Sequence, residues 1–174
     1  MIPAALANVT PIFASRIPYL RRFDYPIDNN RMYHSRPIFG PHKTWRGLLT
    51  GTIVAVTTVY AQTLLWQLPG LRSLIGPTID YAHISIFLYG IAFGLGALGG
   101  DALESFFKRR FNIASGNSWL LFDQVDYVLG AIVATMLLVL LPLYIYVEII
   151  VIFVLVHLLS SYVGFRMGLK DKPI

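Results

Sequence analysis

Long apolar segments alternate with short polar ones along this chain of 174 residues. Residues 48–66 and 84–103 each supply the roughly 20 apolar positions that a helix needs to cross a bilayer. Residues 1–15 are also apolar, although the segment is short and contains Pro3 and Pro11. Because no Lys or Arg precedes this segment, we interpret it as a membrane span rather than as a secretory signal peptide.

The stretch 127–165 is apolar except for one acidic residue, Glu148. As a single helix it would be about 58 Å long, about twice the hydrocarbon thickness of a bilayer. Pro142 predicts a break within it. The sequence thus predicts an all-α polytopic membrane protein, one domain over 1–174 with a bundle of about five transmembrane helices. The predicted spans lie near 1–15, 48–66, 84–103, 126–141 and 143–165.

Composition supports this class of protein. Hydrophobic residues make up 56% of the chain and charged residues 13%, whereas a soluble domain averages about 25% charged residues. These values exclude a disordered chain and argue against an ordinary soluble domain. The absence of cysteine excludes a disulfide framework, a zinc–thiolate centre and a thiol nucleophile.

The positions of the basic residues indicate a membrane orientation rather than nucleic-acid binding, despite the net charge of +5. With five spans, thirteen of the fourteen Lys and Arg residues fall on one side, and Arg72 falls on the other. The positive-inside rule then predicts an external N-terminus, with the C-terminus and the basic loops in the cytoplasm of a multi-pass cell-membrane protein. The thirteen residues are Arg16, Arg21, Arg22, Arg31, Arg36, Lys43, Arg46, Lys108, Arg109, Arg110, Arg166, Lys170 and Lys172.

Acidic residues accompany basic ones at the end of the third predicted span. Asp101, Glu104, Ser105 and Lys108 stand at positions i, i+3, i+4 and i+7, so a helix carries them on one face. Ionisable groups near membrane depth are costly and are usually functional. The alternative is a simple helix end, at which Glu104 and Lys108 form an ion pair and the lysine extends to the interface.

A second acidic pair opens the fourth predicted span. Asp123 and Asp126 are three residues apart and can point into one space. The alternative is a helix cap, for which one carboxylate would suffice. Two carboxylates facing the basic run 108–110 favour a divalent cation.

A basic stretch, residues 40–47, precedes the second predicted span. Lys43, Thr44 and Arg46 could bind phosphate oxygens together with backbone N–H groups at the start of a helix. The alternative is a juxtamembrane anchor, with Trp45 in the interfacial aromatic belt and the cations on lipid headgroups.

Glycines recur in the third predicted span at Gly94, Gly96 and Gly99. Their spacing matches G-x-G-x-x-G, but a dinucleotide site needs a preceding strand, and the sequence predicts none here. We therefore expect these glycines to allow close helix packing.

Acids and bases gathered at one membrane face predict a cytoplasm-facing pocket for metal and phosphate. Acids alone would suggest a cation path, and bases alone would suggest binding to anionic lipid. Magnesium is held by one or two carboxylates plus substrate phosphates, while Lys and Arg neutralise the remaining oxygens. Such a pocket at a membrane surface suggests a soluble phosphate compound that reacts with a lipid.

Several of these motifs resemble those of integral-membrane phosphatidate cytidylyltransferases. Residues 105–109 and 123–126 are similar to their Ser-x-x-Lys-Arg and Asp-Arg-x-Asp signature, and residues 41–47 are similar to Pro-x-Lys-Thr-Trp-Glu-Gly. The chain is closer still to the short archaeal branch, the CDP-archaeol synthases, whose Gly-Asp-x-x-Glu-Ser-Phe-x-Lys-Arg-Arg pattern stands at 100–110. Arg46 and Gln124 replace the Glu and Arg of the bacterial patterns.

The resemblance implies a Mg²⁺-dependent enzyme, with one or two metal ions, that transfers CMP from CTP to a lipid phosphate and releases pyrophosphate. For the archaeal branch the lipid is 2,3-bis-(O-geranylgeranyl)-sn-glycerol 1-phosphate, so the expected partners are CTP, this isoprenoid ether lipid and the surrounding membrane lipids. Asp101, Asp123 and Asp126 are expected to hold magnesium and, with Lys108, to form the catalytic set. The residues expected to bind substrate or nucleotide are Lys43, Thr44, Arg46, Glu104, Arg109, Arg110 and Asn117.

Two other functions compete with this interpretation. A CTP-dependent polyprenol kinase of the dolichol or phytol type has related Lys-Thr and Gly-Asp elements, but it phosphorylates an alcohol from the γ-phosphate. A small transporter or cation channel would need polar residues through the whole bilayer, whereas here they gather at one end.

Overall fold

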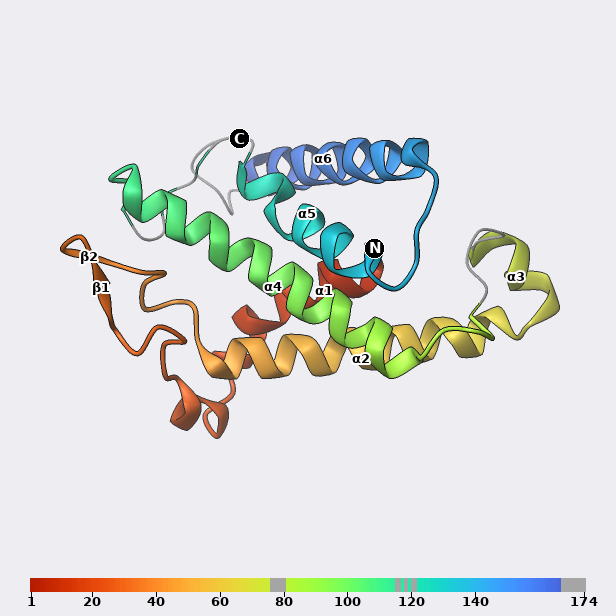
Figure 1. Cartoon of the computed structure of the whole chain (residues 1–174), viewed down its shortest axis with the longest axis horizontal. Helices are drawn as coiled ribbons and strands as arrows, with labels where there is room; N and C mark the ends of the chain where they lie inside the picture. The colour runs from red at the N-terminus through yellow and green to blue at the C-terminus, as the bar shows by residue number, and fades with distance from the viewer. Residues whose placement is uncertain (76–80, 115–116, 118, 120–121, 167–174) are drawn as a thin grey trace.

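The computed structural model describes residues 1–75, 81–114, 117, 119 and 122–166. It is mostly helical, as the sequence predicts, and six α-helices lie in this part of the chain (Figure 1). They are α1 (Ile2–Ala14), α2 (Trp45–Trp66), α3 (Pro69–Ile75), α4 (Ile86–Arg110), α5 (Phe122–Met136) and α6 (Leu143–Arg166). Lys170 and Lys172, which the sequence assigns to the cytoplasmic tail, lie outside the described residues.

Five of these helices coincide with the five segments that the sequence predicts as spans, and their ends differ in two informative places. Helix α4 continues to Arg110 rather than stopping near 103, so the acids and bases that follow its apolar part are helical. Helix α5 ends at Met136, so the predicted end at 141 is wrong. Pro142 disfavours helical backbone at Leu141, and the chain already leaves the helix after Met136, in a turn where the N–H groups of Leu138 and Val139 both donate to the carbonyl of Thr135. The short helix α3 was not predicted.

Two of the described helices, α2 and α4, are both long and apolar enough to cross a bilayer. Helix α1 is apolar but has only 13 residues, about 20 Å of helix. Large apolar side chains face outward on the bundle, among them Ile53 of α2 at 61% and Val133 of α5 at 65% exposure. An outer surface of this kind is expected where lipid, rather than water, surrounds the protein.

Helix α4 lies at the centre of the bundle, and α1, α2 and α5 pack against it (Figure 1). Helix α6 lies on the outer side of α5. A Cβ atom at Gly94 would lie 2.6 Å from the Cα of Thr52 in α2, and one at Gly96 would lie 2.7 Å from the Cβ of Ala134 in α5. Both glycines therefore allow close helix packing, as predicted. Gly99 does not, because a Cβ there would meet nothing within 4 Å.

The segment between α1 and α2 carries a small β-hairpin that the sequence did not predict. A short 3₁₀ turn (Leu20–Phe23) precedes strands β1 (Met32–Tyr33) and β2 (Arg36–Pro37), which pair antiparallel. His34 and Ser35 connect the strands with φ of 50° and 60°, the left-handed conformations that a two-residue hairpin turn requires.

Backbone contacts join the base of this segment to the start of α2. The N–H of Ile27 donates to the carbonyl of Lys43 at 2.8 Å, and the N–H of Trp45 donates to the carbonyl of Tyr25 at 2.9 Å. The two ends of residues 24–43, which we call the hairpin segment, therefore lie close together. Lys43, its last residue, directly precedes the helix cap.

Asp28 organises the interior of the hairpin segment. Its carboxylate is 6% exposed and accepts backbone N–H bonds from Asn30 (3.0 Å), Phe39 (2.9 Å) and Gly40 (3.1 Å). Burial alone would raise the pKa of Asp28, but these N–H donors outweigh it and hold the pKa below its usual range. Gly40 has φ of +102°, a conformation that favours glycine.

Candidate functional site

A polar cavity of about 340 Å³ lies among α1, α4, α5 and the hairpin segment. Its lining combines four acidic residues, three basic ones and two amides, as the sequence analysis expected for a metal and phosphate pocket. These are Asp101, Glu104, Asp123 and Asp126; Lys43, Lys108 and Arg109; and Asn8 and Asn117.

Three of the carboxylates form a compact cluster. Asp101, Glu104 and Asp126 each offer an oxygen atom, and these atoms lie within 4.8 Å of one another. Asp101 and Glu104 share one face of α4, whereas Asp126 comes from α5. The helices can approach there because residue 100 is glycine: a Cβ at Gly100 would collide with the backbone carbonyl of Asp126.

Asp123 stands beside this cluster and contacts Lys108. The Lys108 Nζ lies 2.6 Å from Asp123 Oδ1 and 2.9 Å from Glu104 Oε1. The other oxygen of Asp123 accepts the backbone N–H of Trp119 at 3.0 Å. The expected metal set of Asp101, Asp123 and Asp126 therefore differs from the cluster in one member, since Glu104 occupies the third place. The ion pair between Glu104 and Lys108 on α4, which the sequence analysis gave as an alternative, is also present.

The residues of the basic stretch before α2 have different surroundings, and only some of them reach the polar cavity. The Lys43 Nζ lies 2.6 Å from Asp101 Oδ2, so this side chain reaches the acidic cluster. Thr44 caps α2, because its Oγ1 accepts the N–H of Gly47 at 3.2 Å. Arg46 is 6% exposed and lies 3.2 Å from Asp24, outside the lining of the polar cavity.

The two arginines at the end of α4 point to different surroundings. Arg109 lines the polar cavity, and within the described residues its guanidinium has no acidic partner. Arg110 instead donates to the carbonyls of Tyr33 and Pro37 in the hairpin. Its guanidinium carbon also lies 4.7 Å from the centroid of the Phe106 ring. Arg110 is thus bound within the fold rather than directed into the cavity.

A second cavity of about 310 Å³ adjoins the first and shares Asn8, His42, Lys43 and Asp101 with it. The sequence analysis singled out neither Asn8 nor His42. Asn8 did carry a signal, since it is an amide in an apolar predicted span, where polar groups are costly. For His42, the neighbouring Lys43 was the only hint.

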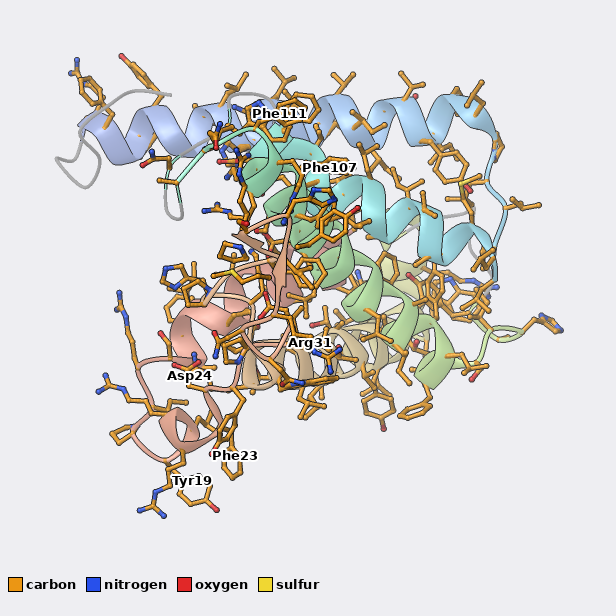
Figure 2. All side chains as sticks on the ribbon, turned by 60° about the vertical axis from the view of Figure 1, so that its left-hand side comes forward. Tyr19, Phe23, Asp24, Arg31, Phe107 and Phe111 are labelled. Carbon is orange, nitrogen blue, oxygen red and sulfur yellow. The ribbon has the colours of Figure 1, made fainter. Side chains whose placement is uncertain are left out.

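An apolar groove of about 750 Å³ runs between α4 and α5 and passes beside the acidic cluster. Glu104 and Asp126 line both the groove and the polar cavity. Gly99 leaves open space on the groove wall, and Phe107 and Phe111 flank it nearer the end of α4. In Figure 2 both rings lie on the C-terminal part of α4, at the opposite side of the view from Tyr19 and Phe23.

The donor atoms of the cluster fit a hard divalent cation. Three carboxylates so close together repel one another when ionised, and Lys43 and Lys108 compensate only part of that charge. Magnesium prefers oxygen ligands and binds through few carboxylates while keeping sites for water and phosphate. Cavity, cations and groove together can accommodate a metal-bound polyphosphate and an apolar molecule that meet at the cluster.

The chain is similar to known proteins of one family. The CarS-like family, described as CDP-archaeol synthase, matches residues 2–174. A CDP-archaeol synthase of Methanosarcina barkeri is 33% identical over 189 residues, covering 99% of both chains. One of Staphylothermus marinus is 31% identical, covering 94% of this chain and 88% of the relative. A solved structure described as an intramembrane enzyme for archaeal membrane lipids biosynthesis superposes with a TM-score of 0.73 at 29% identity, covering 92% of this chain and 89% of that one.

Proposed function

Because the chain belongs to the CDP-archaeol synthase family, a family of CTP-dependent cytidylyltransferases of the membrane, we propose the following reaction for it. The enzyme transfers CMP from CTP to the phosphate of 2,3-bis-(O-geranylgeranyl)-sn-glycerol 1-phosphate and releases pyrophosphate. The observation that carries this proposal is the acidic cluster, which borders both a cation-lined polar cavity and an apolar groove.

The chemistry needs charge neutralisation more than proton transfer. The attacking group is an oxygen of a phosphate monoester, whose second pKa is about 6, so it is mostly dianionic at neutral pH. It attacks the α-phosphorus of CTP, and the bond from that phosphorus to the bridging oxygen of pyrophosphate breaks. Two anions must approach, and the leaving group carries further charge. Aligned cations lower that barrier.

Asp101, Glu104 and Asp126 would hold Mg²⁺, because their oxygen atoms already lie within 4.8 Å of one another. When bound, the metal supplies charge neutralisation at the phosphates of the nucleotide. Asp123 has a different task in this proposal: through its 2.6 Å contact it orients Lys108 toward the cavity. A second metal ion would need Asp123 to leave Lys108.

The triphosphate would meet three cations, Lys43, Lys108 and Arg109. Arg109 lines the cavity and lacks an acidic partner among the described residues, so its guanidinium can bind phosphate oxygens directly. Lys43 and Lys108 contact carboxylates that the metal would also use. Asn117 and Asn8 offer amides at the cavity edge.

The isoprenoid chains of the lipid would occupy the groove between α4 and α5. The groove is apolar except partway along it, where Glu104 and Asp126 also line the polar cavity. A lipid in the groove with its phosphate beside these two acids would meet a nucleotide bound in the polar cavity. This arrangement lets the lipid react without leaving the membrane.

We further propose that the polar cavity faces the cytoplasm. The hairpin segment and the end of α4 lie at the same end of the bundle, because Arg36 contacts the carbonyls of Arg109 and Arg110. Those two regions hold six of the fourteen Lys and Arg residues, and clustered basic residues favour the cytoplasmic side. The chain has no cysteine, so a thiol reagent applied to intact cells should label Leu137→Cys, and Ser35→Cys should react only after the cells are opened.

Labelled CTP identifies the reaction. Purified protein in proteoliposomes receives the ether lipid phosphate or a polyprenol, together with Mg²⁺ and CTP labelled at either the α- or the γ-phosphate. The proposal expects the α-label in the lipid fraction and the γ-label in pyrophosphate. Transfer of the γ-label to a polyprenol would identify a kinase, and CTP that stays intact while ions cross the membrane would identify a transporter; either outcome contradicts the proposal.

A further inference from the structure

Arg36 reaches from the hairpin segment to the end of α4. Its Nη1 donates to the carbonyl oxygens of Arg109 at 3.1 Å and Arg110 at 2.6 Å. Carbonyls in the last turn of a helix have no partner within the helix, and the helix dipole makes this end negative. The guanidinium of Arg36 therefore supplies both hydrogen bonds and charge where α4 needs them.

Arg110 reaches in the opposite direction. Its guanidinium donates to the carbonyls of Tyr33 and Pro37, which flank the hairpin turn, the second at 2.6 Å. The same group lies 5.1 Å from the Tyr33 ring centroid and 4.7 Å from that of Phe106, so it is enclosed by aromatic faces. Each arginine thus bonds the backbone that carries the other.

The hairpin needs this attachment, because each of its strands has two residues. A hairpin of that size is not stable by itself. From Pro37 the chain continues through Phe39 and Gly40, both hydrogen-bonded to Asp28, and arrives at Lys43. The hairpin segment is therefore fastened at its base to α2, in its interior by Asp28, and at its tip by the two arginines.

We propose that Arg36 and Arg110 act as positioning residues, a reciprocal clamp that holds the hairpin segment against α4 and so keeps Lys43 beside the cavity. The inference rests on the proposed function, in which Lys43 binds the nucleotide. Neither arginine lines the polar cavity. Their effect on the reaction passes through the position of Lys43, not through contact with substrate.

The test compares Arg36→Ala, Arg36→Lys and Arg110→Ala with Arg31→Ala, a matched control. Arg31 is an exposed arginine of the same segment, and its side chain makes no hydrogen bond, ion pair or ring contact within the described residues. A nitroxide on Ser35→Cys reports hairpin mobility in each variant, and steady-state kinetics give kcat and KM for CTP. Neither the label position nor Arg31 belongs to the cavity.

The clamp predicts a mobile Ser35 label in the alanine variants, KM for CTP raised about tenfold, and kcat within about threefold of the parent. Arg36→Lys should recover part of the loss, because an ammonium can also bond helix-end carbonyls. The thermal unfolding midpoint of the bundle should stay close to that of Arg31→Ala.

Two results would overturn the clamp: a label as immobile as in the control, or unchanged KM for CTP with the label mobile. A fall in kcat together with a lowered thermal unfolding midpoint would indicate a general structural role and would also overturn the clamp. The label mobility does not depend on turnover. If the parent protein fails to convert CTP, the proposed function fails, while the spectra still decide whether the arginines hold the hairpin.

Discussion

The Lys43 ammonium lies 2.6 Å from the Asp101 carboxylate, across the boundary between the hairpin segment and α4. Lys108 has the same relationship to Glu104 and Asp123. In both cases an ammonium group that could bind phosphate contacts a carboxylate of the acidic cluster, and Lys108 also contacts Asp123 beside the cluster. Metal binding to Asp101 and Glu104 would compete with these contacts and free both ammonium groups for the triphosphate. Metal and nucleotide should therefore favour each other's binding.

Lys43→Ala should have opposite effects on the affinity for nucleotide and on the affinity for metal. Affinity for CTP should fall about tenfold or more, since a charge-assisted hydrogen bond is lost. Affinity for Mg²⁺ or Mn²⁺ alone should rise, because the metal no longer competes with an ammonium for Asp101. Titration calorimetry measures both quantities, with Arg31→Ala as the control. A fall in affinity for metal and nucleotide alike would refute the competition.

Asp123→Asn tests the orientation of Lys108. The change removes the charge that holds Lys108 at 2.6 Å, and we expect kcat to fall by about 10²–10³. The fold should persist, because Asn can still accept the backbone N–H of Trp119. Metal binding without nucleotide should stay within about twofold of the parent, as Asp123 lies outside the cluster. If Mn²⁺ affinity collapses instead, Asp123 is a metal ligand, as the sequence had predicted.

Gly99→Leu tests the groove. A side chain at Gly99 meets no atom within 4 Å at Cβ, so the substitution should fold normally while filling part of the groove. We expect KM for the geranylgeranyl lipid to rise about tenfold, with KM for CTP unchanged. A shorter-chain lipid phosphate should be affected less. Equal kinetics with both lipids would place the chains elsewhere.

Asp28→Asn should weaken the fold in a pH-dependent way. The native pKa of Asp28 is lowered, so its charge stabilises the native state above the unfolded-state pKa of about 3.9. That contribution is lost as pH falls through the lower native pKa. At pH 7 we expect a loss of about 1–2 kcal/mol in unfolding free energy. Melting curves at falling pH should show the variant and the parent converging; a constant difference would argue against the charge.

The hydrophobic pattern predicted the helices of the bundle well, because each predicted span is nearly uncharged and is bounded by charges or proline. Pro142 marks the break between α5 and α6, and α6 begins at Leu143. The convergence of acids and bases at one end was also predictable, from the i, i+3 and i+4 spacing on α4. What spacing could not give is how α5 is rotated against α4. That rotation places Asp126, and not Asp123, next to Asp101.

The roles of the arginines could not be predicted either. Arg36 and Arg110 stand more than seventy positions apart. Nothing in the sequence around one arginine indicates where the other lies in the fold. The hairpin lacks the usual turn residues, since His34 and Ser35 occupy the left-handed positions. Tertiary contacts with α4 decide its conformation. Arg110 was accordingly expected at a substrate phosphate, whereas it bonds the hairpin.

The most direct test of the central claim is magnesium-dependent CTP binding by the purified protein and by Asp126→Asn. Glu148→Gln, which changes an exposed acid on α6, is the matched control. We predict that the parent and the control bind CTP at least about tenfold more tightly with Mg²⁺ than with EDTA. Asp126→Asn should lose that difference while keeping its helical circular dichroism. CTP binding that is equally tight without metal, or unchanged in Asp126→Asn, would contradict the metal–phosphate site.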